Sequence, residues 1–291
     1  MKRPSRSIAA LPTLVTLGNA FCGLLAATYL LEAALAAGQM RTGEAAGLDP
    51  ALIEQHREVF FDYLIKSVWA MFIAMVFDFM DGKVARLTGA ESAFGVQIDS
   101  LSDVISFGLI PALMFKALAE FEFGLRPKTA LFLSSFYLFG AILRLARFNV
   151  EADSEHDDHR SFRGLPSPAA AAGVACIVFL YASSARNELT EGLIDPGLTR
   201  EWIRVSFPYV VTMLGVLMWT RLPYIHFANV LLTERRQPAH FLIVLAVIGV
   251  VAWEPPVALA ALMVVYALSG PAIYVWDLFT GRPTVEGESL L

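Results

Sequence analysis

Long apolar blocks, separated by short polar stretches, dominate this chain of 291 residues. Eight such segments run at about 12–37, 61–82, 94–119, 129–149, 165–185, 206–220, 239–253 and 256–279. A helix needs roughly 17–25 apolar residues to cross the hydrocarbon core of a bilayer, and the segments at 206–220 and 239–253 fit this length least well. We therefore predict an all-α polytopic membrane protein.

Composition supports this prediction and removes several alternatives. Hydrophobic residues make up 56% of the chain and charged residues only 17%, against about 25% in soluble domains. The net charge is −5 and there is no dense basic tract, so no nucleic-acid partner is expected. Cys22 and Cys176 both lie in apolar segments, which predicts buried free thiols rather than a disulfide framework.

The N-terminus resembles a signal peptide at first sight, because basic residues precede an apolar run and Ala34-Leu35-Ala36 resembles a cleavage site. The apolar region of a signal peptide is only about 7–15 residues long. The run here, from Ile8 to Ala37, is much longer. We predict an uncleaved first span.

Lysine and arginine are more frequent on one predicted side of the membrane, which sets the expected orientation. With the N-terminus in the cytoplasm, the cytoplasmic ends carry Lys2, Arg3, Arg6, Lys83, Arg86, Arg144, Arg147, Arg160, Arg163, Arg221, Arg235, Arg236 and Arg282. Both termini are then cytoplasmic, and the polar loops at 38–60 and 186–205 are extracytoplasmic. The charged stretch at 151–160 is expected to be a solvated loop, with stray metal binding by His156 and His159 as the alternative.

Four aspartates stand at the facing ends of the second and third segments. Asp78 and Asp81 are three residues apart, and Asp99 and Asp103 are four apart, so each pair shares a helix face. A short connection makes the two helices antiparallel neighbours. All four carboxylates are therefore expected to meet at one depth, at the cytoplasmic end of the helices.

Four aspartates at such a place need compensating charge. An Asp at mid-bilayer costs roughly 2.5–3.5 kcal/mol, so four cost about 10 kcal/mol. Lys83 and Arg86 are too few to neutralise them, whereas hard divalent cations bind carboxylate oxygens, and two cations can clamp a phosphoryl group. Gly82, Ala85 and Gly95 leave room for a ligand beside the acids. The alternative is two acid pairs solvated among lipid headgroups.

The pattern Asp-x2-Asp-Gly-x2-Ala-Arg-x8-Gly-x3-Asp-x3-Asp, from Asp78 to Asp103, resembles that of the CDP-alcohol phosphotransferases. The resemblance covers roughly residues 10–220. It implies a six-helix catalytic core that opens to the cytoplasm and binds CDP-linked substrates with one or two Mg²⁺ or Mn²⁺ ions. We therefore expect a core at 1–220 and a C-terminal extension at 221–291 with two further spans.

The same resemblance implies roles for individual residues. Asp78, Asp81 and Asp99 would be metal ligands, and Asp103 the general base, in contact with the second metal. The CDP-lipid would contact Thr13, Thr16, Gly82, Ala85, Arg86, Ser92 and Gly95. From the residues alone, Thr13 and Thr16 are more typical of helix caps or interhelical hydrogen bonds than of nucleotide contacts.

Three stretches, at 11–23, 143–149 and 162–171, resemble the phosphatidylserine synthases of bacteria and archaea within this family, with Thr13 in place of their usual asparagine. A serine site needs a fixed cation for the carboxylate, so Arg144, Arg147 and Asn149 are the candidate serine contacts. The two arginines would alternatively anchor lipid phosphates.

The predicted reaction is transfer of the phosphatidyl group from CDP-diacylglycerol to L-serine, with release of CMP. Glycerol 3-phosphate, inositol phosphate and choline are the alternative acceptors. An ion-coupled transporter and a non-catalytic lipid-binding scaffold are alternatives of another class. Membrane lipids are expected partners, and the family resemblance implies a homodimer.

Overall fold

The fold was obtained as a computed structural model, which describes residues 6–89, 92–153, 164–189, 194–222, 224, 245 and 248–280. The principal helices are α1 (Arg6–Ala46), α2 (Pro50–Thr88), α3 (Ala93–Asp103), a π-helix η1 (Val104–Leu109), α4 (Ile110–Phe121), α5 (Pro127–Asp153), α6 (Ser167–Ala185), α7 (Pro196–Trp219) and α10 (Pro255–Thr280). The described ranges contain no strand. The protein is an all-α bundle.

Seven stretches of the described chain are long and apolar enough to cross a membrane, with α3, η1 and α4 forming one of them. They correspond to seven of the eight predicted segments, including 206–220, which lies within α7. These spans confirm the prediction of a multi-pass integral membrane protein. Most of the predicted span at 239–253 lies outside the described residues, so α10 is the described span of the expected extension.

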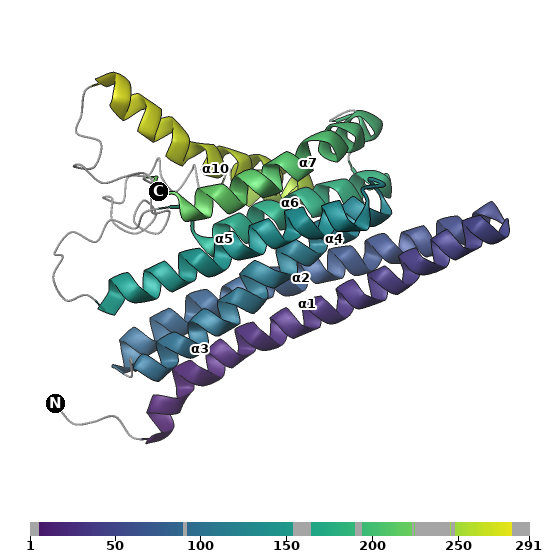
Figure 1. Ribbon diagram of the computed structural model, residues 1–291. Coiled ribbons are helices and arrows are strands. Elements are labelled where there is room, and N and C mark those ends of the chain that lie inside the picture. The colour runs from purple at the N-terminus through teal and green to yellow at the C-terminus, as the bar shows by residue number, and fades with distance from the viewer. Residues whose placement is uncertain are drawn as a thin grey trace.

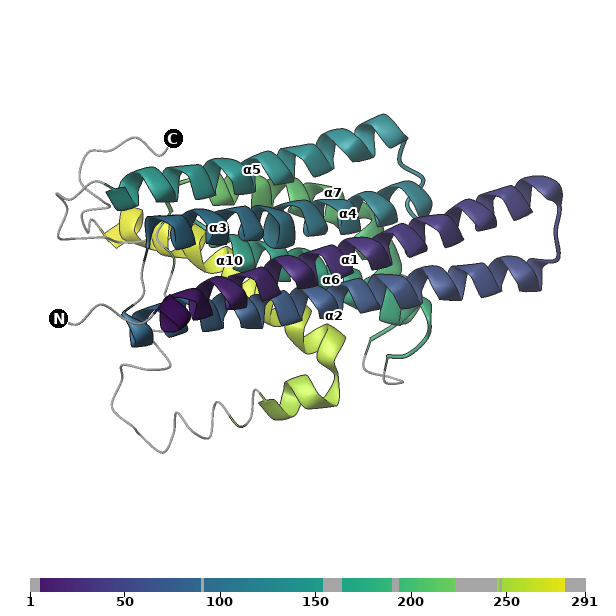
Figure 2. The same cartoon turned by 90° about the horizontal axis from the view of Figure 1, so that it is seen from below.

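The helices run lengthwise, and α1 and α2 lie side by side and extend beyond the other helices at one end (Figures 1 and 2). The predicted polar loop at 38–60 is therefore wrong as secondary structure: α1 continues to Ala46 and α2 begins at Pro50. Gly47, with φ of 68°, allows the reversal, and Asp49 caps α2 by accepting the Ala51 N–H at 3.0 Å. The polar residues lie on a projecting helical hairpin.

A π-helix interrupts the third span directly after Asp103. Pro111 has no N–H to donate to the carbonyl of Phe107, four residues earlier, so the regular helical bond at this point is impossible. The chain widens instead, with Ile110 N–H bonding to Ile105 O, and the buried Tyr137 hydroxyl donates to Phe107 O at 3.2 Å. The carbonyl that Pro111 leaves free is thus satisfied by α5.

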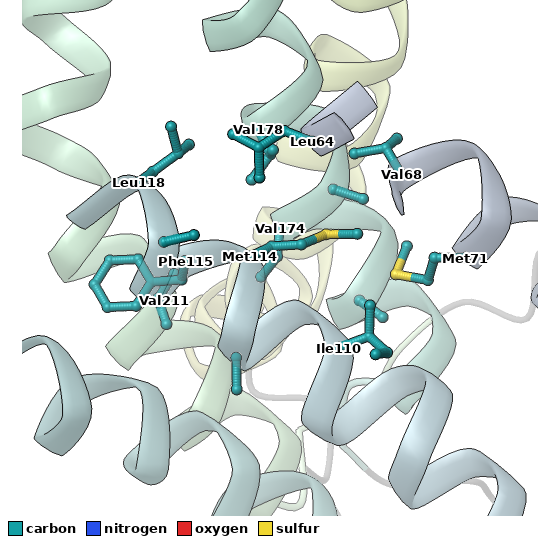
Figure 3. Close-up of a cluster of buried hydrophobic side chains, with 14 of the residues drawn as sticks. Leu64, Val68, Met71, Ile110, Met114, Phe115, Leu118, Val174, Val178 and Val211 are labelled. Atoms are coloured by element: carbon teal, nitrogen blue, oxygen red, sulfur yellow. The ribbon is translucent and has the colours of Figure 1, made fainter. Parts of the chain in front are cut away.

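Apolar side chains from four helices fill the centre of the bundle. Figure 3 shows this cluster, whose labelled members are Leu64, Val68, Met71, Ile110, Met114, Phe115, Leu118, Val174, Val178 and Val211. Small residues allow close helix contact elsewhere: a Cβ on Gly140 of α5 would lie 2.5 Å from the backbone oxygen of Gly215 in α7. This packing fixes α2, α4 and α6 relative to one another and holds the aspartate-bearing ends in register.

Candidate active site

Three of the four aspartates converge as predicted. Each of Asp78, Asp99 and Asp103 offers a carboxylate oxygen, and these oxygens all lie within 4.8 Å of one another. Asp81, one turn along α2 from Asp78, is buried with 6% of its surface exposed. The helices α2 and α3 therefore bring the two acid pairs to one end of the bundle, opposite the projecting hairpin (Figure 1).

The aspartate oxygens leave unused acceptor capacity in this cluster. Within the described chain, Asp81 Oδ2 and Asp99 Oδ1 are buried and accept no hydrogen bond. A buried, unpaired carboxylate oxygen is expensive, and oxygen-rich sites of this kind suit hard divalent cations. The donor set of Asp78, Asp81, Asp99 and Asp103 thus fits Mg²⁺ or Mn²⁺.

A second polar layer, from α1, orients Asp103. Asn19 is completely buried, and its side-chain amide donates to Asp103 Oδ1 at 3.1 Å. Ser106 in the π-helix donates to Asn19 O at 3.2 Å, and a Cβ on Gly23 would lie 2.6 Å from the Ser106 hydroxyl. Our sequence reasoning assigned Asn19 no role, although a carboxamide inside an apolar span is itself a signal of a polar site.

The candidate CDP-lipid contacts surround the ends of α2 and α3. Arg86 folds back along its own helix, with Nε donating to Gly82 O at 3.1 Å, and its side chain is exposed. Ser92 caps α3 by accepting the Gly95 N–H at 3.0 Å. Ala85 lies half-buried between Gly82 and Arg86 along α2.

The two threonines of α1 lie on the same helix as Asn19. Thr16 is buried and its hydroxyl donates to Pro12 O at 3.1 Å, the carbonyl four residues earlier. Thr13 is half-buried. The Thr16 hydroxyl keeps its lone pairs for a further partner.

The three candidate serine contacts differ in their surroundings. Arg144 donates from Nη1 to the Ser167 hydroxyl at 2.6 Å and interacts electrostatically with Asp78 and Asp103. Its Nε is buried and has no hydrogen-bond partner among the described residues. Arg144 is therefore a fixed cation with a free donor beside the acidic cluster.

Arg147 and Asn149 make structural contacts. Arg147 donates from Nη1 to Trp219 O at 2.8 Å, at the C-terminal end of α7. Asn149 exchanges hydrogen bonds with Ser100, at 2.9 and 3.1 Å, and so joins α5 to α3 next to Asp99. Of the two, Asn149 lies on the aspartate side. His156, His159, Arg160 and residues 162–163 lie outside the described residues.

Fold and site together define a multi-pass membrane protein with a partly buried acidic centre able to hold a divalent cation. Residues 9–214 match the family model of CDP-alcohol phosphatidyltransferase, and the chain belongs to this family. The family resemblance predicted from the aspartate pattern is thereby confirmed. The matched region contains nearly all of α1 to α7 and excludes α10.

Three individual relatives are named for serine phosphatidyl transfer or archaetidylserine synthesis. The chain is 34% identical over 207 residues to a CDP-diacylglycerol–serine O-phosphatidyltransferase of Helicobacter pylori, covering 71% of this chain and 78% of the relative. It is 35% identical over 144 residues to the protein of the same name in Saccharomyces cerevisiae, covering 48% of this chain and 49% of the relative. It is 37% identical over 127 residues to an archaetidylserine synthase of Methanothermobacter thermautotrophicus, covering 43% of this chain and 49% of the relative.

Proposed function

We propose that this protein transfers the phosphatidyl group of CDP-diacylglycerol to L-serine, producing phosphatidylserine and CMP. The observation that carries the proposal is Arg144, whose Nε is buried and has no partner in the described chain, and whose guanidinium interacts electrostatically with Asp78 and Asp103. A carboxylate is the natural partner of such a guanidinium, and serine carries one whereas choline does not. Relatives named for serine transfer, at 33–35% identity, support the same acceptor.

The aspartates would hold the cation and diphosphate. Asp78, Asp81 and Asp99 are the proposed ligands for Mg²⁺ or Mn²⁺, with Asp103 in contact with a second ion. Bound ions would neutralise the diphosphate and stabilise the charge on the departing CMP. The chain contributes the fixed geometry, because α2 and the third span, which carry the ligands, are packed together by the apolar cluster of Figure 3.

Asp103 is the proposed general base. It is 8% exposed, and the hydrogen bond from Asn19 to Oδ1 fixes its orientation. A serine hydroxyl is a weak acid and needs a positioned base. Its oxygen would form a bond to the lipid-side phosphorus, the bond from that phosphorus to CMP would break, and the proton would pass to Asp103.

Thr13, Thr16, Gly82, Ala85, Arg86, Ser92 and Gly95 are proposed to line the CDP-lipid side. Arg86 and Ser92 lie at the end of the bundle, where a nucleotide reaches the site from water while the acyl chains remain in the bilayer. Arg144 would bind the serine carboxylate, with Asn149 supporting it through its contacts with α3. Arg147, which bonds to the C-terminal end of α7, would instead fix the position of α5 relative to α7.

We also propose that the site and both termini face the cytoplasm, that residues 1–220 form the catalytic core, and that the protein is a homodimer. The excess of Lys and Arg at the site end supports the orientation. Labelling with an impermeant reagent of single cysteines introduced at the exposed Leu87 and Leu48, at opposite ends of α2, tests it. Crosslinking in the membrane tests the dimer.

The acceptor assay is the decisive test. Purified protein receives CDP-diacylglycerol, Mn²⁺ and radiolabelled serine, glycerol 3-phosphate, inositol phosphate or choline in parallel. We expect lipid-soluble label and stoichiometric CMP release with serine. Transfer to glycerol 3-phosphate but not to serine would overturn the proposal, and absence of CMP release with every acceptor would favour a transporter or a scaffold.

A further inference from the structure

One amide oxygen beside the acidic cluster is buried and has no hydrogen-bond partner. Asn19 of α1 is completely buried, and its Nδ2 donates to Asp103 Oδ1 at 3.1 Å. An ionised carboxylate only accepts hydrogen bonds, so it fixes which end of the amide faces it. Oδ1 is the other end of this amide, and no described residue donates to it. A buried acceptor without a donor is costly, so Asn19 Oδ1 needs a partner from outside the chain.

The unpartnered buried side-chain oxygens of the described chain all belong to this part of the molecule. Besides Asn19 Oδ1 they are Asp81 Oδ2 and Asp99 Oδ1, and both aspartates are proposed metal ligands. Because the nitrogen and oxygen of an amide are about 2.3 Å apart, Asn19 Oδ1 lies no more than about 5.4 Å from Asp103 Oδ1. The carboxylate oxygens of the cluster lie within a similar distance of one another, 4.8 Å. Asn19 Oδ1 therefore belongs to the same group of oxygens.

Tight packing on two sides fixes Asn19 in this position. One residue earlier, a Cβ on Gly18 would lie 2.7 Å from the ring of Phe77, which precedes Asp78 in α2. On the other side, Ser106 of the π-helix donates to Asn19 O at 3.2 Å. Helix α1 is thus held against both spans that carry the aspartates, and the amide stays at the depth of the cluster.

A carboxamide also suits the charge balance of the site. The four aspartates carry four negative charges when they are ionised, and two divalent cations balance these charges. Hard cations bind the carbonyl oxygen of asparagine as well as carboxylate oxygens. An amide therefore adds an oxygen ligand to the centre without adding a further negative charge.

We propose that Asn19 Oδ1 is a further, uncharged oxygen ligand of the metal centre, supplied by α1, while Nδ2 of the same amide holds Asp103. The inference rests on the metal-binding part of the proposed function and does not depend on which alcohol is the acceptor. It makes the first span a direct part of the metal centre, together with α2 and the third span.

The first test measures Mn²⁺ binding to the purified full-length protein by titration calorimetry, with no lipid substrate present. Asn19→Ala should weaken binding by roughly 10-fold or more, because even the outer partners of metal ligands contribute about 10- to 100-fold to affinity. The matched control is Ser67→Ala, which also removes a buried polar group between α1 and α2, a hydroxyl that donates to Ala26 O at 3.0 Å. This control should unfold at a lower temperature and bind Mn²⁺ as the wild-type protein does. An unchanged Mn²⁺ affinity in Asn19→Ala would overturn the inference.

A second variant separates metal ligation from the support of Asp103. Asn19→Cys replaces the amide oxygen by sulfur, which favours softer metal ions, and removes the donor to Asp103. We expect Cd²⁺ bound to this variant to give a thiolate-to-metal charge-transfer band in the ultraviolet. The wild-type protein is the control, since it carries the native thiols of Cys22 and Cys176. The same spectrum in variant and wild type would show that Asn19 only supports Asp103, which overturns the inference, and this comparison decides the question if Asn19→Ala does not fold.

The outcomes separate the inference from the function on which it rests. If the wild-type protein binds no Mn²⁺, the metal-binding part of the proposed function fails, and the inference fails with it. If the wild-type protein binds Mn²⁺ and the Asn19 variants behave as their controls do, the inference alone is wrong. If Mn²⁺ affinity depends on Asn19 but the phosphatidyl group passes to another alcohol, the choice of serine is wrong and the inference stands.

Discussion

The convergence of three carboxylates makes a quantitative prediction for Asp99→Asn. At 4.8 Å, two unit negative charges repel each other by about 0.9 kcal/mol in water and by about 3.5 kcal/mol at an effective dielectric constant of 20. Neutralising Asp99 removes two of the three pairwise repulsions among Asp78, Asp99 and Asp103. Without divalent ions, and at a pH high enough to ionise all three carboxylates, the variant should therefore be more stable than the wild-type protein by about 2–7 kcal/mol.

Divalent ions should narrow this difference in stability and, where the difference lies near 2 kcal/mol, reverse it. A ligand that binds only the folded state stabilises it by about 2.7 kcal/mol at one hundred times its dissociation constant. Wild-type protein should therefore gain stability when Mn²⁺ replaces EDTA, whereas Asp99→Asn, which lacks one proposed ligand, should gain little. The same variant should lose transferase activity while being the more stable protein in EDTA.

The assay is thermal unfolding of the purified protein in EDTA and along an Mn²⁺ titration. Asp62→Asn is the matched control, because Asp62 lies at the other end of the bundle, where it pairs with Lys66 at 2.7 Å. This control should keep the full response to Mn²⁺. If Asp99→Asn unfolds at a lower temperature than wild type in EDTA, or responds to Mn²⁺ as strongly as wild type, the electrostatic reasoning is refuted.

Two further predictions test the base and the packing. Asp103→Asn should abolish turnover while leaving CDP-diacylglycerol binding measurable, because the amide cannot accept the hydroxyl proton; near-normal turnover would remove Asp103 from the base role. Gly140→Ala should destabilise the protein by about 1–3 kcal/mol, since its Cβ would lie 2.5 Å from the backbone of Gly215 and force α5 and α7 apart. Gly38→Ala, which meets nothing within 4 Å, should leave the unfolding temperature unchanged or slightly raised, and similar losses in both variants would contradict the packing argument.

Much of the fold and the acidic centre follows from short-range regularities. The span lengths come from the apolar blocks, and the convergence of Asp78, Asp99 and Asp103 follows from spacings of three and four residues on adjacent antiparallel helices. Both predictions depend on the period of a helix and on the thickness of a bilayer. Neither needs knowledge of which distant segments touch.

The features that the sequence did not predict depend on such distant contacts. Asn19 is 84 residues from Asp103, and Arg147 is 72 residues from the carbonyl of Trp219 that it binds. The helical hairpin at 38–60 was predicted as a loop because its residues are polar, but a helix that continues beyond the bilayer is polar for the same reason. The ion pair between Arg57 and Glu122, at 3.0 Å, joins this hairpin to the bundle, and its two residues are 65 positions apart in the sequence.

The π-helix at Val104–Leu109 has a consequence for how this protein tolerates changes in length. A π-turn is equivalent to one extra residue in a regular helix, and one residue corresponds to about 100° of rotation. A single deletion here would restore regular winding and turn α4 by about that angle relative to Asp103. Either the aspartate would leave the acidic cluster, or Met114 and Phe115 would leave the core. Substitutions that keep the residue count should be accepted in this segment far more readily than a one-residue gap.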